Sequence, residues 1–333
     1  MKFDGKVVLV TGGAGFIGST LVRELLKQNA TVIVYDNMLI GDESNLNEIK
    51  NSIKIIRGDI RDKNFKDVLI KNDVEFVFNL AAEPYIPHCY ERPTQFFNVN
   101  ANGAMNVILS CKEAGVKRVI QYSTSEVYGT ARHIPMDENH PNNPMSTYAV
   151  SKLAADRLCF TLHREQNIPI ITLRQFNSYG PRETQPYVIP EIITQLSNSN
   201  KLRLGNINAR RDFTYVEDAA KAAIALMKNK KAEGGVFNSG YGEDYSIEEI
   251  AYMIAELMNR KSVKIIIDQK RLRPLDVERL QCNYFKLHKL TTWKPKIDIE
   301  EGLRRTIDWF NENNKRWMWE TKIVAEHLMW KGK

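Results

Sequence analysis

Short apolar runs alternate with amphipathic segments along the first half of the chain. Runs rich in β-branched residues, which predict buried strands, fall at residues 6–11, 31–35, 53–56, 75–80 and 118–123. Segments with the 3.6-residue spacing of a helix lie between them, most clearly residues 16–28 and 98–113. Strand–helix alternation is typical of a parallel sheet covered by helices, so we expect an α/β fold with a doubly wound parallel sheet.

The second half of the chain has a looser pattern. Residues 147–166 predict a long helix and residues 168–174 a further buried strand, and later helices are expected at 189–197, 216–228, 246–259 and 300–313. No repeat or low-complexity linker is present. We therefore expect a sheet domain over residues 1–180, a smaller C-terminal α/β region over 181–315 that packs on it, and an extension over 316–333. This extension carries Trp317, Trp319 and Trp330, for which the sequence predicts no role.

The composition is that of an ordinary globular protein. Of the 333 residues, 43% are hydrophobic and 26% charged, and no apolar run approaches the roughly 20 residues of a membrane span. The first residues enter a strand-like run without a signal-peptide pattern, so a cytoplasmic location is expected. Cys89, Cys111, Cys159 and Cys282 form no CxxC pair. We therefore expect reduced thiols, with neither a disulfide framework nor a metal site.

The formal net charge is +7, with basic clusters at residues 210–211, 228–231 and 270–273. These clusters lack interleaved aromatic residues, so solvated surface is a better interpretation of the lysine run than nucleic-acid binding. Arg211 and Arg273 are instead expected to face an anionic substrate, because the guanidinium fork matches phosphate oxygens. Surface ion pairs are the alternative for both arginines.

A glycine-rich loop follows the first expected strand. Gly12, Gly15 and Gly18 are spaced GxxGxxG directly before a helix, where glycines permit a tight turn and let backbone N–H groups approach a pyrophosphate. The second strand ends in Asp36, 18 residues beyond Gly18. An acid there accepts hydrogen bonds from ribose hydroxyls and repels a 2′-phosphate, which favours NAD over NADP. The alternative is that Asp36 only caps a turn.

Tyr148 and Lys152 are four residues apart in the long helix, which puts both side chains on one helix face. An ammonium beside a phenol is expected to stabilise the phenolate and lower the phenol pKa. Thr124 follows another strand in the run Ser-Thr-Ser-Glu. Its hydroxyl can hold a substrate oxygen while Tyr148 moves the proton.

Taken together, these motifs resemble those of the extended short-chain dehydrogenases/reductases, in particular the nucleotide-sugar epimerase/dehydratase group. The resemblance runs from Lys6 to about Asn313. Its elements are the glycine loop, Asp36-Asn37, Gly58-Asp59-Ile60, Leu80-Ala81-Ala82, Asn100, Thr124, Tyr148 with Lys152, residues 176–182, Arg211-Asp212-Phe213 and Arg273-Pro274. Asn79 stands where many relatives have histidine.

The resemblance implies a role for each matching position. The implied NAD-binding residues are Gly12, Gly15, Phe16, Ile17, Gly18, Asp36, Asn37, Asp59, Ile60, Leu80, Ala81, Ala82, Asn100, Tyr148 and Lys152, with Asp59 and Ile60 at the adenine. The implied substrate-binding residues are Glu83, Thr124, Asn177, Val188, Arg211 and Arg273. The implied catalytic residues are Thr124, Ser125, Glu126, Tyr148 and Lys152.

The family offers three main reactions that begin with oxidation of a sugar hydroxyl, usually at C4, by Tyr148 and NAD. The 4-keto sugar is then epimerised, decarboxylated if it is a glucuronate, or dehydrated across C5 and C6 with the hydride returned to C6. Only dehydration needs a base at C5, and Glu126 can face the same cleft as Thr124. We therefore expect a UDP- or GDP-linked sugar 4,6-dehydratase, and Glu83 resembles the dehydratase pattern too.

Several alternatives stay open. Ser125 stands where dTDP-glucose dehydratases have an aspartate, which leaves the acid at C6 unassigned. UDP-glucuronate decarboxylases share the Thr-Ser-Glu run, but their further arginine- and asparagine-bearing segment after the Tyr-Gly-Pro-Arg motif is not evident here. Residues 183–190 instead resemble the UDP-sugar dehydratase and epimerase pattern. A UDP-sugar 4-epimerase and a decarboxylase therefore remain as alternatives. An NAD-binding sensor or scaffold is the non-enzymatic alternative. A homodimer is expected through the helices at residues 102–113 and 147–164.

Overall fold

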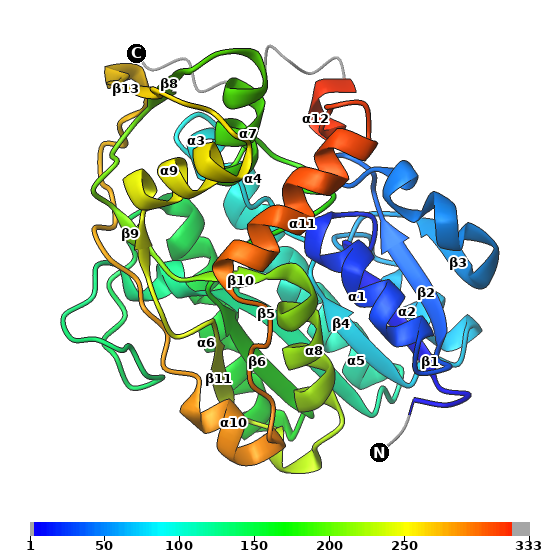
Figure 1. Cartoon of the computed structure of the whole chain (residues 1–333). Helices are drawn as coiled ribbons and strands as arrows, with labels where there is room; N and C mark the ends of the chain where they lie inside the picture. Colours follow the sequence, from blue (N-terminus) through cyan, green and yellow to red (C-terminus); the bar gives the residue numbers. More distant parts are fainter. Residues whose placement is uncertain (1–2, 322–333) are drawn as a thin grey trace.

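A computed structural model describes residues 3–321. Its centre is a seven-stranded sheet in the order β11-β6-β5-β4-β1-β2-β3, with every strand parallel to its neighbours (Figure 1). The strands are β1 (Val7–Thr11), β2 (Thr31–Asp36), β3 (Ile53–Arg57), β4 (Phe76–Asn79), β5 (Arg118–Thr124), β6 (Ile170–Gln175) and β11 (Val236–Ser239). The order reverses at β1, with β4 on one side and β2 on the other, which makes this a doubly wound Rossmann sheet as expected.

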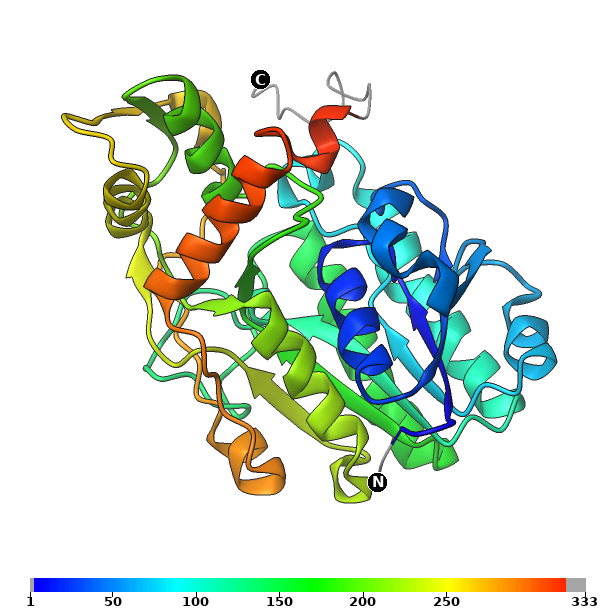
Figure 2. The same ribbon diagram turned by 45° about the vertical axis from the view of Figure 1, so that its right-hand side comes forward.

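Both faces of the sheet are buried, because alternate residues of a strand point to opposite faces. On β1, Val8 and Val10 belong to a core that includes residues of helices α1 (Phe16–Leu26) and α8 (Val216–Met227). Leu9, between them, belongs to a second core with residues of α2 (Phe65–Lys71) and α5 (Ala104–Glu113). Figure 2 shows α1 and α8 side by side on one face of the sheet.

Most of the strands and helices expected in the first half are confirmed. Helix α6 (Thr147–Gln166) has the bounds that the sequence predicts. The expected helix at residues 98–113 has two parts, since a wider π-helical stretch over Asn98–Gly103 precedes α5. A 3-10 helix over Glu43–Ser52 and the short helices α2, α3 (Ile86–Cys89) and α4 (Pro93–Phe97) were not predicted.

The range 181–315 contributes to the sheet layers as well as to a separate core. Strand β11 pairs with β6, and α8 covers the same face as α1. The separate core includes residues of α7 (Val188–Asn198), α9 (Ile247–Leu257) and α11 (Ile299–Glu312), all three predicted within two residues at either end. Around it lie short strand pairs and helices: β7 (Asn177–Tyr179) with β10 (Phe213–Tyr215), β8 (Lys201–Leu204) with β13 (Lys264–Ile267), β9 (Arg210–Arg211) with β12 (Tyr245–Ser246), α10 (Phe285–Thr291) and α12 (Met318–Thr321).

The described part of the C-terminal extension packs against this second core. Trp317 is fully buried, and its indole N–H donates a hydrogen bond of 2.9 Å to Thr194 Oγ1 in α7. Its ring stacks between Phe310 and Trp319, with centroid distances of 5.2 and 5.3 Å. Trp330 lies outside the described residues.

Within residues 3–321 no helix is long and apolar enough to cross a membrane. In the same range no group of three or more His, Cys, Asp or Glu side chains is arranged to hold a metal ion. The four cysteines are buried free thiols.

Candidate active site

The glycine loop joins β1 to α1 at the carboxyl edge of the sheet. Gly12 has a positive φ of 67°, and a Cβ atom there would lie 2.8 Å from the backbone nitrogen of Ala81. At Gly18 a Cβ atom would collide with the backbone oxygen of Gly12. Only glycine therefore lets this loop close on itself and on the segment after β4. The loop leads into the N-terminus of α1, where the helix dipole favours an anionic ligand.

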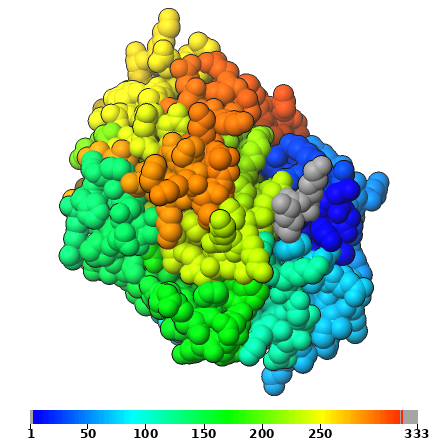
Figure 3. Space-filling view, turned by 90° about the horizontal axis from the view of Figure 1, so that it is seen from below, coloured from blue at the N-terminus to red at the C-terminus, as the bar shows by residue number. Residues whose placement is uncertain are grey.

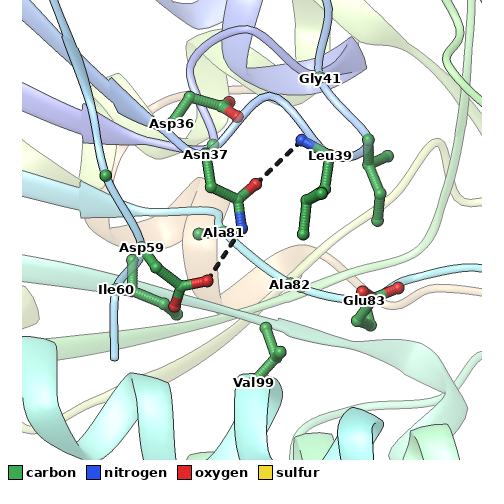
Figure 4. A pocket seen from close by; sticks show the side chains of 13 residues that line it. Asp36, Asn37, Leu39, Gly41, Asp59, Ile60, Ala81, Ala82, Glu83 and Val99 are labelled. Atoms are coloured by element: carbon green, nitrogen blue, oxygen red, sulfur yellow. Dashed lines mark hydrogen bonds between the residues drawn. The ribbon is translucent and has the colours of Figure 1, made fainter. Parts of the chain in front are cut away.

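A pocket lies beside this loop (Figure 4). Of the expected cofactor residues, it brings together Gly12, Asp36, Asn37, Asp59, Ile60, Ala81 and Ala82, and Glu83 of the expected substrate set also lines it. Leu39, Ile40, Gly41, Gly58 and Val99 complete the lining and were not predicted. Ile17 and Leu80 instead pack against the core of the sheet.

Asp36 ties the end of β2 to the glycine loop. One carboxylate oxygen accepts a hydrogen bond of 3.0 Å from Ala14 N, and the other accepts one of 2.9 Å from Met38 N. Gly41 approaches so closely that a Cβ atom would lie 2.9 Å from Asp36 Oδ2. Asp36 therefore has the turn-capping role that the sequence left open, and it also lines the pocket.

Asp59 lies across the pocket from Asp36. Its carboxylate accepts two hydrogen bonds of 2.8 Å from the Arg61 guanidinium and one of 3.0 Å from Asn37 Nδ2. The Arg61 hydrogen bonds are the largest cause that lowers the pKa of Asp59 to about 2, so this carboxylate is ionised throughout the neutral range. Ile60, next in sequence, is buried.

Asn100 holds the segment after β4 in place. Its side-chain amide accepts a hydrogen bond of 2.8 Å from Glu83 N and donates to Glu83 O and Ser151 Oγ, both at 3.0 Å. This links the segment to α6, the helix that carries Tyr148 and Lys152. Burial raises the pKa of the Glu83 carboxyl, which accepts a hydrogen bond from Gln95.

Asn79, which stands where many relatives have histidine, belongs to a buried polar chain. Its Oδ1 accepts a hydrogen bond from Thr11 Oγ1, and its Nδ2 donates to Gln121 Oε1, both at 2.6 Å. Thr11 Oγ1 also accepts from Ala81 N. The amide thus satisfies polar groups on both neighbouring strands, and the departure from histidine affects packing beneath the pocket rather than the pocket lining.

Thr124 ends β5 and begins a single 3-10 turn, Ser125–Tyr128. The Thr124 hydroxyl caps this turn by accepting a hydrogen bond of 3.2 Å from Glu126 N. Ser125 and Glu126 are both buried. The end of β5 and this turn therefore present three buried polar side chains, Thr124, Ser125 and Glu126.

Tyr148 comes to the same place from the first turn of α6. The helix begins there because Ser146 accepts a capping hydrogen bond from Ala149 N. Burial is the largest effect on Tyr148 and raises its pKa, a hydrogen bond with Thr124 opposes the rise, and Glu126 adds to it. Thr124, Glu126 and Tyr148 therefore interact at one site, as the sequence predicts.

The effect of Lys152 on the pKa of Tyr148 differs from what the sequence predicts. Lys152 Nζ donates a hydrogen bond of 2.6 Å to the backbone oxygen of Tyr122, and Lys152 is not among the groups that shift the Tyr148 pKa. The expected lowering of that pKa is therefore wrong for this structure, because burial is the largest effect and raises the pKa. Burial also lowers the pKa of Lys152 itself, to about 8.

Arg211 and Arg273 converge on one carboxylate, that of Asp276, at 3.4 and 3.8 Å. Burial lowers the pKa of Arg211, and the nearby Glu126 carboxylate opposes that shift, which places Arg211 beside the Thr124 turn. Asn177, at the start of β7, has a buried Oδ1 without a hydrogen-bond partner among the described residues. Val188 begins α7.

The sequence did not single out several side chains that surround Tyr148. Burial raises the pKa of Tyr187, with further contributions from Tyr148 and Glu183. The Cys89 thiol hydrogen-bonds to the backbone at Tyr148 and Thr147. Tyr85 packs edge-on against Tyr187, with ring centroids 5.7 Å apart. Tyr187 and Glu183 lie within residues 183–190, and the resemblance of that run to the dehydratase and epimerase pattern was the available signal.

The parallel sheet, the glycine loop and the acid at the end of β2 define a dinucleotide-binding protein of the Rossmann class. The family model described as GDP-mannose 4,6 dehydratase matches residues 9–306. The chain therefore belongs to the nucleotide-sugar epimerase/dehydratase family of extended short-chain dehydrogenases/reductases.

Three relatives show the range of the family. The chain is 34% identical to a UDP-N-acetyl-α-D-glucosaminuronate decarboxylase of Bacillus cytotoxicus, over 92% of this chain and 98% of that protein. It is 31% identical to the human dTDP-D-glucose 4,6-dehydratase, over 94% and 92% of the two chains. The crystal structure of the Thermus thermophilus UDP-glucose 4-epimerase in complex with NAD superposes with a TM-score of 0.83 at 30% identity, covering 92% of this chain and 99% of that one.

Proposed function

We propose that this protein is an NAD-dependent nucleotide-sugar 4,6-dehydratase. The observation that carries the proposal is the position of Glu126. Its buried carboxylate lies on the same turn as Thr124, within electrostatic reach of Tyr148 and Arg211. A base at C5 is the one group that dehydration needs and epimerisation does not, and Glu126 supplies a carboxylate where such a base is required.

The residues around the glycine loop fit NAD. The loop has no room for Cβ atoms at Gly12 or Gly18, so its backbone can approach a pyrophosphate at the start of α1. Asp36 lines the pocket and keeps a negative charge where a 2′-phosphate would lie, which favours NAD over NADP. Asp59 and Ile60 are proposed to meet the adenine, and the segment 80–82 with Asn100 to form the opposite wall. NAD, when bound, supplies the oxidation of C4 and the later reduction at C6.

The chain's own residues handle the protons. Tyr148 takes the proton of the C4 hydroxyl, while Thr124 holds that oxygen through its hydroxyl. Lys152 is proposed to hold the cofactor ribose and to position Tyr148 by anchoring α6 on the backbone oxygen of Tyr122. Glu126 then removes the C5 proton, which the new C4 carbonyl acidifies, and the C6 hydroxyl leaves as water. Glu126, protonated by that step, is the group on this turn that can deliver a proton to the C6 hydroxyl, with Ser125 beside it.

Arg211 and Arg273 are proposed to bind the diphosphate and nucleotide part of the substrate, which is UDP- or GDP-linked. Both arginines are held by Asp276, so their side chains are oriented before an anion arrives. Asn177 offers a buried oxygen without a described partner, and Glu83 and Val188 complete the proposed sugar and nucleotide contacts. We assign substrate binding to the part of residues 181–315 outside β11 and α8.

A UDP-sugar 4-epimerase is the second candidate. Ser125 favours it, because this buried residue is not ionisable and offers no carboxyl acid for the C6 hydroxyl. Tyr148 and Thr124 suffice for epimerisation. Decarboxylation begins with the same oxidation at C4 and remains the third candidate reaction if the substrate is a glucuronate.

Mass spectrometry of the purified protein with a panel of UDP-, GDP- and dTDP-sugars tests the proposal. A product lighter by one water, formed without net consumption of added NAD, is expected. An isomer of unchanged mass would assign the reaction as 4-epimerisation instead of dehydration. Loss of carbon dioxide would assign it as decarboxylation. Absence of any product with the whole panel would favour a non-catalytic NAD-binding protein.

We also propose a homodimer through α5 and α6. Met105 on α5 and Val150 and Phe160 on α6 are exposed apolar side chains, although most of the neighbouring apolar residues on these helices are buried. Pairing the two helices with their copies would cover them in a four-helix interface.

A further inference from the structure

A basic groove lies near the amino ends of the sheet strands, whereas the candidate active site lies at their carboxyl ends. It is lined by Lys221, Ile224, Ala225, Lys228, Asn229, Lys230, Leu290 and Thr291, and so it is formed by the end of α8 and by α10. Asn229 Nδ2 donates a hydrogen bond of 2.9 Å to Leu290 O and joins the two walls. Figure 3 views this face of the molecule, with the two walls side by side in yellow-green and orange.

The groove is remote from the catalytic residues. Arg118, the first residue of β5, donates a hydrogen bond to the backbone oxygen of Met227 at the end of α8, whereas Thr124 is the last residue of that strand. A seven-residue strand is about 20 Å long. A ligand of the groove would therefore not touch the proposed substrate.

Three lysines line this groove, Lys221, Lys228 and Lys230, and the two segments that form it contain further lysines. Residues 221–232 and 286–297 together contain eight lysines and no acidic residue, and the net charge of the whole chain is +7. Taken without these lysines, the protein carries almost no net charge. The sequence alone predicts solvated surface for residues 228–231, and only the fold brings that run beside the second lysine-rich segment.

Most of these lysines have no acidic partner. Among the described residues, only Lys221 is within 4.0 Å of a carboxylate, that of Glu217 at 3.3 Å. Burial lowers the pKa of Lys228, and no described carboxylate opposes that effect. Like charges that remain unpaired repel one another, so a ligand with several negative charges would relieve a repulsion that the fold itself does not.

We propose that this groove binds an acidic segment of a partner protein. Ile224, Ala225 and Leu290 form an apolar floor between the lysines, which suits the side chains of a peptide with carboxylates on either side. Lysines rather than arginines line the groove, and no aromatic ring does, so neither the bidentate phosphate contacts nor the base stacking typical of nucleic-acid sites is present there.

Fluorescence anisotropy with a labelled peptide of alternating Glu and Leu tests this proposal on the full chain. The variant Lys228→Gln/Lys230→Gln/Lys231→Gln is compared with Lys63→Gln/Lys71→Gln/Lys261→Gln. The second variant loses the same charge at three exposed lysines that also lack a described acidic partner. The groove variant should bind roughly 10-fold more weakly, since three exposed charge contacts are together worth about 1.4 kcal/mol, and the control should bind like the wild type.

Two results would overturn the proposal. Equal loss of affinity in both variants would show attraction to net charge alone. Tighter binding of phosphatidylserine vesicles or of an oligonucleotide than of the peptide, lost in the groove variant, would assign the groove to a phosphate-bearing surface instead. Dehydratase or epimerase activity should be the same in both variants, so the outcome does not depend on the proposed function.

Discussion

Lys152 donates its hydrogen bond to the backbone oxygen of Tyr122, 2.6 Å away, on the strand that ends in Thr124. This contact anchors α6 to β5 and thereby sets Tyr148, one turn earlier on the helix, beside the strand's carboxyl end. The contact between Lys152 and Tyr122 therefore positions Tyr148, the proposed base, and Lys152 also brings a positive charge to the site.

Replacing Tyr148 by Phe should lower turnover by about 10²- to 10⁴-fold, the usual contribution of a general base. NAD binding, followed by isothermal titration, should change little, because the phenol is only one of many proposed contacts. Tyr252→Phe, at an exposed tyrosine of α9, is the matched control. Wild-type turnover in Tyr148→Phe would remove Tyr148 from the mechanism.

Glu126→Gln should abolish exchange of the C5 proton with solvent deuterium while NADH still forms on mixing with substrate. The amide keeps the size of the side chain but cannot take the proton. Mass spectrometry of the recovered sugar and the absorbance of NADH measure the two steps separately. If deuterium still enters at the wild-type rate, Glu126 is not the C5 base.

Lys152 should make stability depend on pH in a defined window. Its pKa is about 8 in the folded protein and 10.5 for the free side chain, so the unfolded chain binds more protons between these values. The free energy of unfolding of the wild type, relative to Lys152→Met, should therefore rise with pH across this window, by at most about 1.4 kcal/mol per pH unit. Below pH 8 both states carry the proton and the difference should be flat. Urea unfolding at a series of pH values measures it, and a constant difference from pH 7 to 10 would contradict the lowered pKa.

Trp317→Ala should destabilise the protein by about 3–5 kcal/mol, because it empties a fully buried site between Phe310 and Trp319. Phe285→Ala removes an aromatic ring that is 63% exposed and should change stability by less than about 0.5 kcal/mol. Chemical denaturation of both variants is the measurement. Equal midpoints would mean that the extension contributes nothing to the second core.

Val150→Asp/Phe160→Asp should convert the proposed homodimer to a monomer in light scattering at micromolar concentration. A buried carboxylate in an apolar interface carries a desolvation penalty of several kcal/mol. Ile70→Asp, at an exposed apolar residue of α2, is the control and should stay dimeric. A monomeric wild type would refute the dimer directly.

The sequence by itself determined the sheet class, the glycine loop and the pairing of Tyr148 with Lys152. These features depend on local spacing: period 2 in strands, 3.6 in helices, and glycines at fixed intervals. The bounds of α6 agree for the same reason, since the capping Ser146 and the apolar period lie within one segment.

Only the tertiary structure decided which distant residues meet. Asp276 lies between Arg211 and Arg273 because the segment after β13 folds back past β9. Strand β11 joins the sheet beside β6, and Tyr187 and Cys89 come to Tyr148 from segments that are far from it in the sequence. The two lysine-rich walls of the basic groove are more than 50 residues apart in sequence. Contacts of this kind are set by the burial of apolar faces across the whole chain, which no local pattern records.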